Sequence, residues 1–284
     1  MSDLASSPKL IFKNRGDSTE RLTLRLAAAA RKCIVRFTGG CGEMSEGDGD
    51  RLKELFSPAF VGFEGALTFG GTRMVYRADW SRVRQGITEI PPHLKQTVCP
   101  NAVLLGIVPR TADIGICEIG VKIEDDPKND FFTIVHPDQD HALVIQINAD
   151  NACPKIDDKV RMSAAGTPLP APNVWDAEFE ECMRITGILR ECFDGYGSVL
   201  IAYNGGGTTE REIVATSDRG WPVILIKGSG RKTDEYASNK EFLALRDNVR
   251  VVDKDPSAIR AALAEFGAVP ERRMSLVGKG SRSA

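Results

Sequence analysis

Four glycine-rich turns, each following an apolar stretch, contain the residues best suited to chemistry in this chain. They read FTGG, FGGTR, YNGGGTTERE and KGSGR, and their candidate ligand-binding residues are Gly39, Gly40, Gly70, Gly71, Thr72, Arg73, Gly205, Gly206, Gly207, Thr208, Thr209, Glu212, Gly228, Ser229, Gly230 and Arg231. Glycines let the backbone approach an anion, and a helix start presents unpaired N–H groups with the positive end of its dipole. One such turn is weak evidence, but four in one alternating chain predict a shared nucleotide cleft.

The last turn is the most informative, because an apolar strand at Val223–Ile226 runs directly into it and a helix is expected to begin near Asp234. Arg231 follows Gly-Ser-Gly, which favours a phosphate contact over a surface position. Asp234 either caps its helix or contacts the ligand. Arg73 either pairs with a diphosphate through a charge-assisted contact or is a solvated residue at a helix start.

The NGGGTTERE turn offers two interpretations. The hydroxyl of Thr208 or Thr209 either caps the following helix or binds a phosphate oxygen. Glu210 and Glu212 fall in the first turn of that helix, where the dipole favours carboxylates. An ordinary capped turn between a strand and a helix would satisfy this pattern, and so would a nucleotide site in which a carboxylate accepts from ribose hydroxyls.

The sequence gives little support for a metal centre or for a serine or cysteine nucleophile. The three histidines, His93, His136 and His141, form no HExxH or paired Cys/His spacing, so we expect no metal. His141 is either a hydrogen-bonded structural residue or a ligand contact. The chain has no GxSxG motif, and its seven cysteines include no CxxC pair, which indicates free thiols in a reducing compartment.

Composition narrows the function classes further. The 284 residues are 42% hydrophobic and 27% charged with a net charge of -2, as in an ordinary globular protein without a nucleic-acid or membrane-surface partner. No apolar run approaches the ~20 residues of a membrane span. A cytoplasmic location is therefore expected.

Alternating strands and helices predict the fold. We expect strands at 33–37, 65–69, 101–109, 131–135, 141–147, 197–203, 222–226 and 248–252, and helices over 49–57, 73–85, 175–192, from 208, from 234 and over 256–266. Strands that alternate with helices pair in parallel through right-handed crossovers. The prediction is an α/β, Rossmann-like, doubly wound and largely parallel sheet flanked by helices, with its ligand over the carboxyl ends of the strands.

The predicted organisation is a single domain with two extensions. Residues 1–20 form a polar arm or an added sheet edge, residues 21–268 form the nucleotide-binding domain, and residues 269–284 form a basic flexible tail. Residues 148–173, rich in Asn, Asp, Pro and Ala, are the expected long surface loop.

Two resemblances sharpen the functional hypothesis. NGGGTTERE resembles the PGGxGTxxE signature of the LOG phosphoribohydrolases, which belong with the DNA-processing DprA proteins to the SLOG superfamily of Rossmann-like nucleotide-handling domains. Gly205, Gly206, Thr209 and Glu212 match it, whereas Asn204 replaces the signature proline and Thr208 replaces its third glycine. A DprA-like role in DNA binding lacks the expected basic surface.

A closer resemblance is to the cytoplasmic N-terminal region of the TRPM channels and its free-standing prokaryotic relatives, the LSDAT domains. RFTGG, ALTFGG, LLGIVPR, DQDHALVI and PVILIKGSGRKTD occur here in the order typical of that family, over about residues 33–237. The resemblance implies a sensor or effector module that binds an ADP-ribose-like, cyclic ADP-ribose-like or NAD-related ligand. It implies no required cofactor, and it is compatible with an effector protein as partner and with a homo-oligomer.

The alternative is an enzyme. The resemblance to LOG proteins implies an N-glycosidic hydrolase that releases a base from a nucleotide, in which Glu212 assists at the ribose and Arg73 stabilises developing charge. The absent proline and third glycine favour binding without turnover.

Overall fold

The computed structural model of the chain describes residues 9–14, 18–20, 23, 27, 33–40, 48–69, 73–76, 83–84, 86–110, 120–121, 131–134, 143–148 and 176–271. Its strands are β1 (Lys9–Asn14), β2 (Cys33–Gly39), β3 (Ala66–Phe69), β4 (Arg73–Tyr76), β5 (Val83–Arg84), β6 (Val103–Arg110), β7 (Gly120–Val121), β8 (Phe131–Ile134), β9 (Leu143–Asn148), β10 (Gly197–Tyr203), β11 (Val223–Ile226) and β12 (Val249–Val252). Its α-helices are α2 (Asp48–Phe56), α3 (Ile90–Thr97), α4 (Asp176–Cys192), α5 (Gly207–Asp218), α6 (Arg231–Ser238), α7 (Lys240–Ala244) and α8 (Pro256–Glu265), and two 3₁₀ turns are η1 (Pro58–Phe60) and η2 (Ile87–Glu89).

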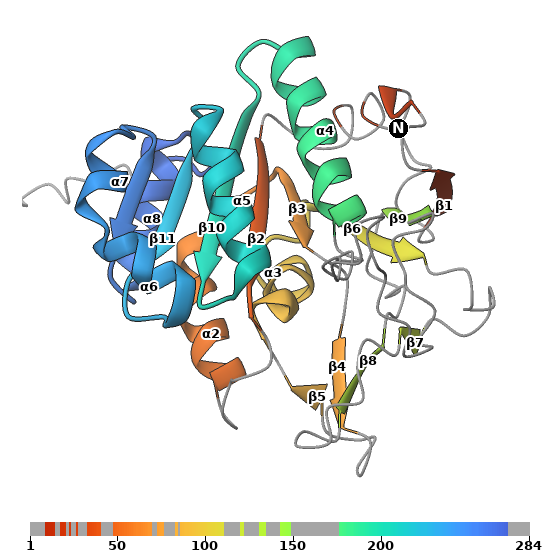
Figure 1. Cartoon of the computed structure of the whole chain (residues 1–284), viewed down its shortest axis with the longest axis horizontal. Coiled ribbons are helices and arrows are strands. Elements are labelled where there is room, and N and C mark those ends of the chain that lie inside the picture. Colours follow the sequence, from red (N-terminus) through yellow and green to blue (C-terminus); the bar gives the residue numbers. More distant parts are fainter. Residues whose placement is uncertain are drawn as a thin grey trace, which may run out of the picture.

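The main sheet has eight strands in the order β1-β9-β6-β3-β2-β10-β11-β12, and every pair in it is parallel. From β2 the chain proceeds outward through β3 and β6, then returns to β10 on the other side of β2 and proceeds through β11 and β12 (Figure 1). This is the doubly wound, Rossmann-like arrangement predicted from the sequence. Its topological switch point lies between β2 and β10, where such sheets bind their ligands.

Alternating side chains of β2 divide the core between the two faces of the sheet. Val35 and Phe37 pack in the cluster that includes residues of α2, α3 and α8, whereas Ile34 packs against α4. A third cluster joins β10 and β11 to α5, α6 and α7. The helices therefore form two layers, and both faces of the parallel sheet are covered, which explains the continuous apolar runs of the central strands.

A second, antiparallel sheet of four strands was not predicted. Its order is β5-β4-β8-β7, and it lies beyond the carboxyl ends of the main strands (Figure 1). The helix predicted over 73–85 is wrong, because β4 and β5 occupy both ends of that segment. The Met-Val-Tyr run of β4 is rich in residues that favour strands, and β8 supplies the partner strand.

The edge of the main sheet also involves the amino-terminal segment. β1 pairs in parallel with β9, so residues 9–14 form an added sheet edge, one of the two alternatives predicted for residues 1–20. The predicted bounds of two segments are wrong at their first residues: Val269, expected in the flexible tail of 269–284, is buried in the core, and Asn148, expected in the surface loop of 148–173, is the last residue of β9. The rest of that loop and the tail from 272 onward lie outside the described residues.

Candidate functional site at the switch point

Two of the predicted glycine turns flank the switch point directly. Gly39 and Gly40 end β2, and Gly205 lies just beyond the neighbouring strand β10. A Cβ on Gly39 would collide with the backbone carbonyl of Tyr203, and a Cβ on Gly40 would lie 3.4 Å from the Cα of Gly205. The two turns are therefore packed backbone against backbone, and at Gly39 only glycine allows this approach.

The Arg231 side chain joins the third turn to the first two. Its Nη2 lies 3.1 Å from the position a Cβ would take on Gly206, and its Nη1 lies 3.4 Å from the equivalent position on Gly40. Three of the four predicted turns thus meet around one guanidinium group. Arg231 itself has a φ of 48°, a left-handed conformation that is uncommon for residues other than glycine.

The fourth predicted turn is described only in part. Gly70, Gly71 and Thr72 lie outside the described residues. Arg73 is the first residue of β4, where its backbone pairs with Ile134 of β8. Since β3 of the main sheet ends at Phe69, Arg73 begins the second sheet four positions later in the sequence.

The turn between β10 and α5 is held by its neighbours. Asn204 and Gly205 have φ values of 61° and 91°, and a Cβ on Gly205 would overlap the Thr209 hydroxyl. The backbone N–H of Asn204 donates to the Ser229 hydroxyl at 2.9 Å, and the Thr233 hydroxyl donates to the Asn204 carbonyl at 2.5 Å. The side-chain oxygen of Asn204 is buried and has no hydrogen-bond partner among the described residues.

The helix that follows begins without a side-chain cap. Gly206 is the N-cap residue of α5 and offers no side chain to the first-turn N–H groups. The buried Thr209 hydroxyl faces the sheet, where it lies 3.3 Å from the hydroxyl of Thr38. An uncapped helix start beside an arginine is suited to an anion, because N–H groups and dipole both favour negative charge there.

The Gly-Ser-Gly turn after β11 is braced by Asp234. The Asp234 carboxylate accepts hydrogen bonds from the backbone N–H groups of Gly228 at 2.6 Å and Gly230 at 3.0 Å. Ser229 accepts from Asn204 through its hydroxyl. These contacts engage the donors of the turn within the protein and fix the backbone from which Arg231 projects.

Glu212 lies in a buried ion cluster with Arg36 and Glu178. Arg36 Nη2 is 2.5 Å from Glu212 Oε1 and 2.8 Å from Glu178 Oε1. Thr209 and Glu212 are three residues apart on α5 and face Thr38 and Arg36 of β2. The cluster therefore continues from the uncapped helix start into the interior of the protein. Glu212 is accordingly only 2% exposed.

The electrostatics of this cluster follow from its composition. Two carboxylates surround one guanidinium, so full ionisation would leave an unbalanced negative charge in the interior. Burial raises the pKa of Glu178 to about 7, against the opposing effect of Arg36 and with a further increase from Glu212. Burial alone would lower the pKa of Arg36, but Cys182, Glu178 and Glu212 together raise it. Burial also raises the pKa of Cys182 to about 11.

Sequence reasoning missed Arg36 and Glu178. The available signal was a single arginine inside the otherwise apolar CIVRF strand, since a buried charge requires a partner. Its partners come from α4 and α5, and Glu212 is 176 positions away along the chain. No local pattern could identify them.

Within the described ranges no three His, Cys, Asp or Glu side chains are grouped so that they could hold a metal ion. His93 contacts the Ser57 hydroxyl at 3.0 Å, whereas His136 and His141 lie outside these ranges. None of the described helices is both long enough and apolar enough to cross a bilayer.

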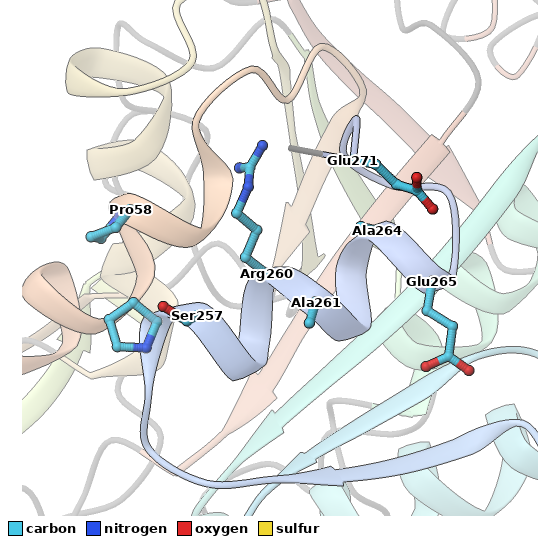
Figure 2. Close-up of a pocket in the computed structure, with 8 residues that line it drawn as sticks. Pro58, Ser257, Arg260, Ala261, Ala264, Glu265 and Glu271 are labelled. Carbon is cyan, nitrogen blue, oxygen red and sulfur yellow. The ribbon is translucent and has the colours of Figure 1, made fainter. Parts of the chain in front are cut away.

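A separate cavity of about 540 Å³ lies on the outer flank of α8 (Figure 2). Small side chains such as Ala261 and Ala264 line it, and Glu271 lies at its rim. Arg260, which also lines it, donates to the backbone carbonyls of Ala59 and Val61. None of the predicted site residues that the structure describes borders this cavity.

No protein-family model and no curated protein matches the chain. Among solved structures, the chain is similar to TM1055, a structural genomics target, with 15% identity and a TM-score of 0.42 over 83% of this chain and 99% of the other. It is also similar to two structures of the molybdenum cofactor (Moco) carrier protein from Chlamydomonas reinhardtii, with 16% identity and TM-scores of 0.42 and 0.43, over 84% of this chain and 99% of each of those chains.

Proposed function

We propose that the chain binds a nucleotide-derived small molecule at the switch point, with a phosphate group at the start of α5. The observation that carries the proposal is the Arg231 guanidinium, which lies against Gly206 and Gly40 at the carboxyl ends of the paired strands β2 and β10. A guanidinium beside a helix start that has no side-chain cap offers a phosphate both charge and directed donors. At Gly207, the first residue of α5, a Cβ would meet nothing within 4 Å, so an anion has room to approach the backbone there.

The ligand class follows from the resemblance to the SLOG superfamily, and in particular to the LSDAT domains. It indicates an ADP-ribose-, cyclic ADP-ribose- or NAD-related ligand, sensed without turnover. In this proposal a partner protein reads the bound state. The second sheet supports it as well, because β4 and β8 lie beyond the carboxyl edge, where they can contact a ligand larger than one phosphate (Figure 1).

A screen of candidate ligands tests the proposal. AMP, ADP, ADP-ribose, cyclic ADP-ribose and NAD are each added to the purified chain while its melting temperature is measured. A ligand at ~100 times its dissociation constant should stabilise the fold by about 2.7 kcal/mol. Mass spectrometry of small molecules released from the purified protein identifies any ligand retained from the cell. No thermal response and no retained nucleotide would contradict the proposal.

The second candidate is a nucleotide N-glycosidase that resembles the LOG enzymes. One observation favours it: the Oε2 of Glu212 has no hydrogen-bond partner among the described residues. Glu212 is the sixth residue of α5, however, so it lies in the second turn of the helix and not in the first turn, as the sequence predicted. Against it, the Glu212 side chain is closed off from solvent and paired with Arg36. Chromatography of nucleoside monophosphates, NAD and ADP-ribose incubated with the protein decides between the two. Base release that is lost in Glu212→Gln establishes the enzyme, and no release in the wild type supports the sensor.

A further inference from the structure

A second cation approaches the switch point from the other layer of helices. Lys254 follows β12, but its Cε lies 3.8 Å from the position a Cβ would take on Gly228, in the turn after β11. Its Nζ lies 5.5 Å from the centre of the Tyr203 ring, at the end of β10. The lysine side chain therefore crosses the carboxyl ends of three neighbouring strands and holds its ammonium group on an aromatic face.

This ammonium group is not neutralised by the part of the chain that the structure describes. No described carboxylate lies within ion-pair distance of Lys254, although Asp253 precedes it. By contrast, the nearby Lys232 pairs with Glu210 at 3.3 Å and Glu235 at 2.9 Å. The Tyr203 ring positions the ammonium without cancelling its charge, so the charge remains available to an anion.

Arg231 and Lys254 approach the packed glycine turns after β2 and β10 from opposite faces of the main sheet. Arg231 begins α6, which belongs to the layer with α5, whereas the Tyr203 ring packs with the cluster under α2, α3 and α8. The adjacent glycines of β2 contact both sides: a Cβ on Gly39 would meet the Tyr203 carbonyl, and a Cβ on Gly40 would lie 3.4 Å from Arg231 Nη1. An anionic ligand at this edge is therefore offered one cation from each helix layer.

We propose that Lys254, held on the ring of Tyr203, forms a second anion subsite, so that the ligand carries two anionic groups, as in a nucleoside diphosphate. The inference rests on the proposed function, and it specifies the number of phosphates. A monophosphate engages only the subsite at Arg231 and the start of α5. The subsite at Lys254 then distinguishes diphosphates from monophosphates by charge.

Calorimetry with AMP and ADP tests the second subsite. Lys254→Met keeps the apolar stem and removes the charge, and Lys240→Met removes an exposed charge on α7 as the matched control. Wild type should bind ADP more tightly than AMP. Lys254→Met should weaken ADP binding about tenfold, the effect of losing one charged contact, and leave AMP binding within about twofold. Lys240→Met should change neither affinity.

Each other outcome overturns the inference in a recognisable way. Equal affinities of the wild type for AMP and ADP, or an unchanged preference in Lys254→Met, would remove the second subsite while leaving the proposed function intact. Equal losses for AMP and ADP in Lys254→Met would place Lys254 at the first phosphate. If neither nucleotide bound the wild type, this inference would fail, whereas the proposed function would be decided separately by the screen with ADP-ribose, cyclic ADP-ribose and NAD. Thermal unfolding of the unliganded variants confirms that they are folded.

Discussion

The buried cluster of Arg36, Glu178 and Glu212 predicts an unusual dependence of stability on pH. Glu178 is buried against α5 and β2, and burial raises its pKa from an ordinary value of 4.5 to about 7. The folded protein then binds a proton that the unfolded chain releases between these two values. Stability from this group is fully present below about pH 4.5 and is lost as the pH rises through about 7.

The magnitude follows from the same two values. At about 1.4 kcal/mol for each pH unit, the difference between 4.5 and about 7 corresponds to about 3–4 kcal/mol. About 3 kcal/mol of this is present at pH 4.5, because half of the unfolded chains are already ionised at this carboxyl. The glutamine in Glu178→Gln is a neutral isostere, so this variant should lose the pH-dependent component. The difference in unfolding free energy between wild type and variant should therefore be about 3 kcal/mol more favourable to the wild type at pH 4.5 than at pH 8.

Urea denaturation at several pH values between 4.5 and 8 measures this difference. The contributions of other titrating groups to the unfolding free energy are common to wild type and variant, so they cancel in the difference. Glu191→Gln, an exposed carboxylate at the end of the same helix, is the control and should show no such trend. A difference that is constant with pH would refute the reasoning. One that grew with pH would show that the field of Arg36 outweighs burial and that the Glu178 pKa is lowered.

Two other substitutions test how the site is built. Arg36→Met should destabilise the fold by about 3–5 kcal/mol in urea denaturation, because it leaves two buried carboxylates without their cation; a loss below about 1 kcal/mol would show that the cluster is dispensable. Gly205→Ala should cost about 1–3 kcal/mol, because the residue has a φ of 91° and its Cβ would overlap Thr209. Gly207→Ala, where a Cβ meets nothing within 4 Å, is its matched control, and equal effects would mean that the conformation of Gly205 is not required.

The main sheet could be predicted from sequence because its signals are local and strong. Continuous apolar runs such as Val223–Ile226 are buried on both faces and end at glycines, and both features can be read without knowledge of the partners. The helix predicted over 73–85 failed for the opposite reason. β4 and β5 are short, and β4 is determined by its pairing with β8, a strand far along the chain.

The candidate site shows the same contrast between features with a local sequence signal and features that depend on distant parts of the chain. The glycine turns could be predicted, and the contact of Arg231 with two of them follows from the order of strands at the switch point. The role of Asp234 could not be decided from the sequence, because helix capping and ligand contact both require a carboxylate at this position. In the structure this carboxylate accepts hydrogen bonds from the backbone N–H groups of Gly228 and Gly230. Pairing of Lys254 with Tyr203 depends on the neighbouring positions of β10, β11 and β12, which periodicity does not specify.

The most direct test of the central claim is calorimetric titration of ADP-ribose into wild type and Arg231→Ala. We expect saturable binding by the wild type and a binding free energy weaker by about 1.5–3 kcal/mol in the variant, the usual contribution of a hydrogen bond to a charged group. The unliganded variant should unfold at nearly the wild-type urea concentration, because Arg231 is exposed. Wild-type binding that Arg231→Ala leaves unchanged would contradict a phosphate site at the start of α5.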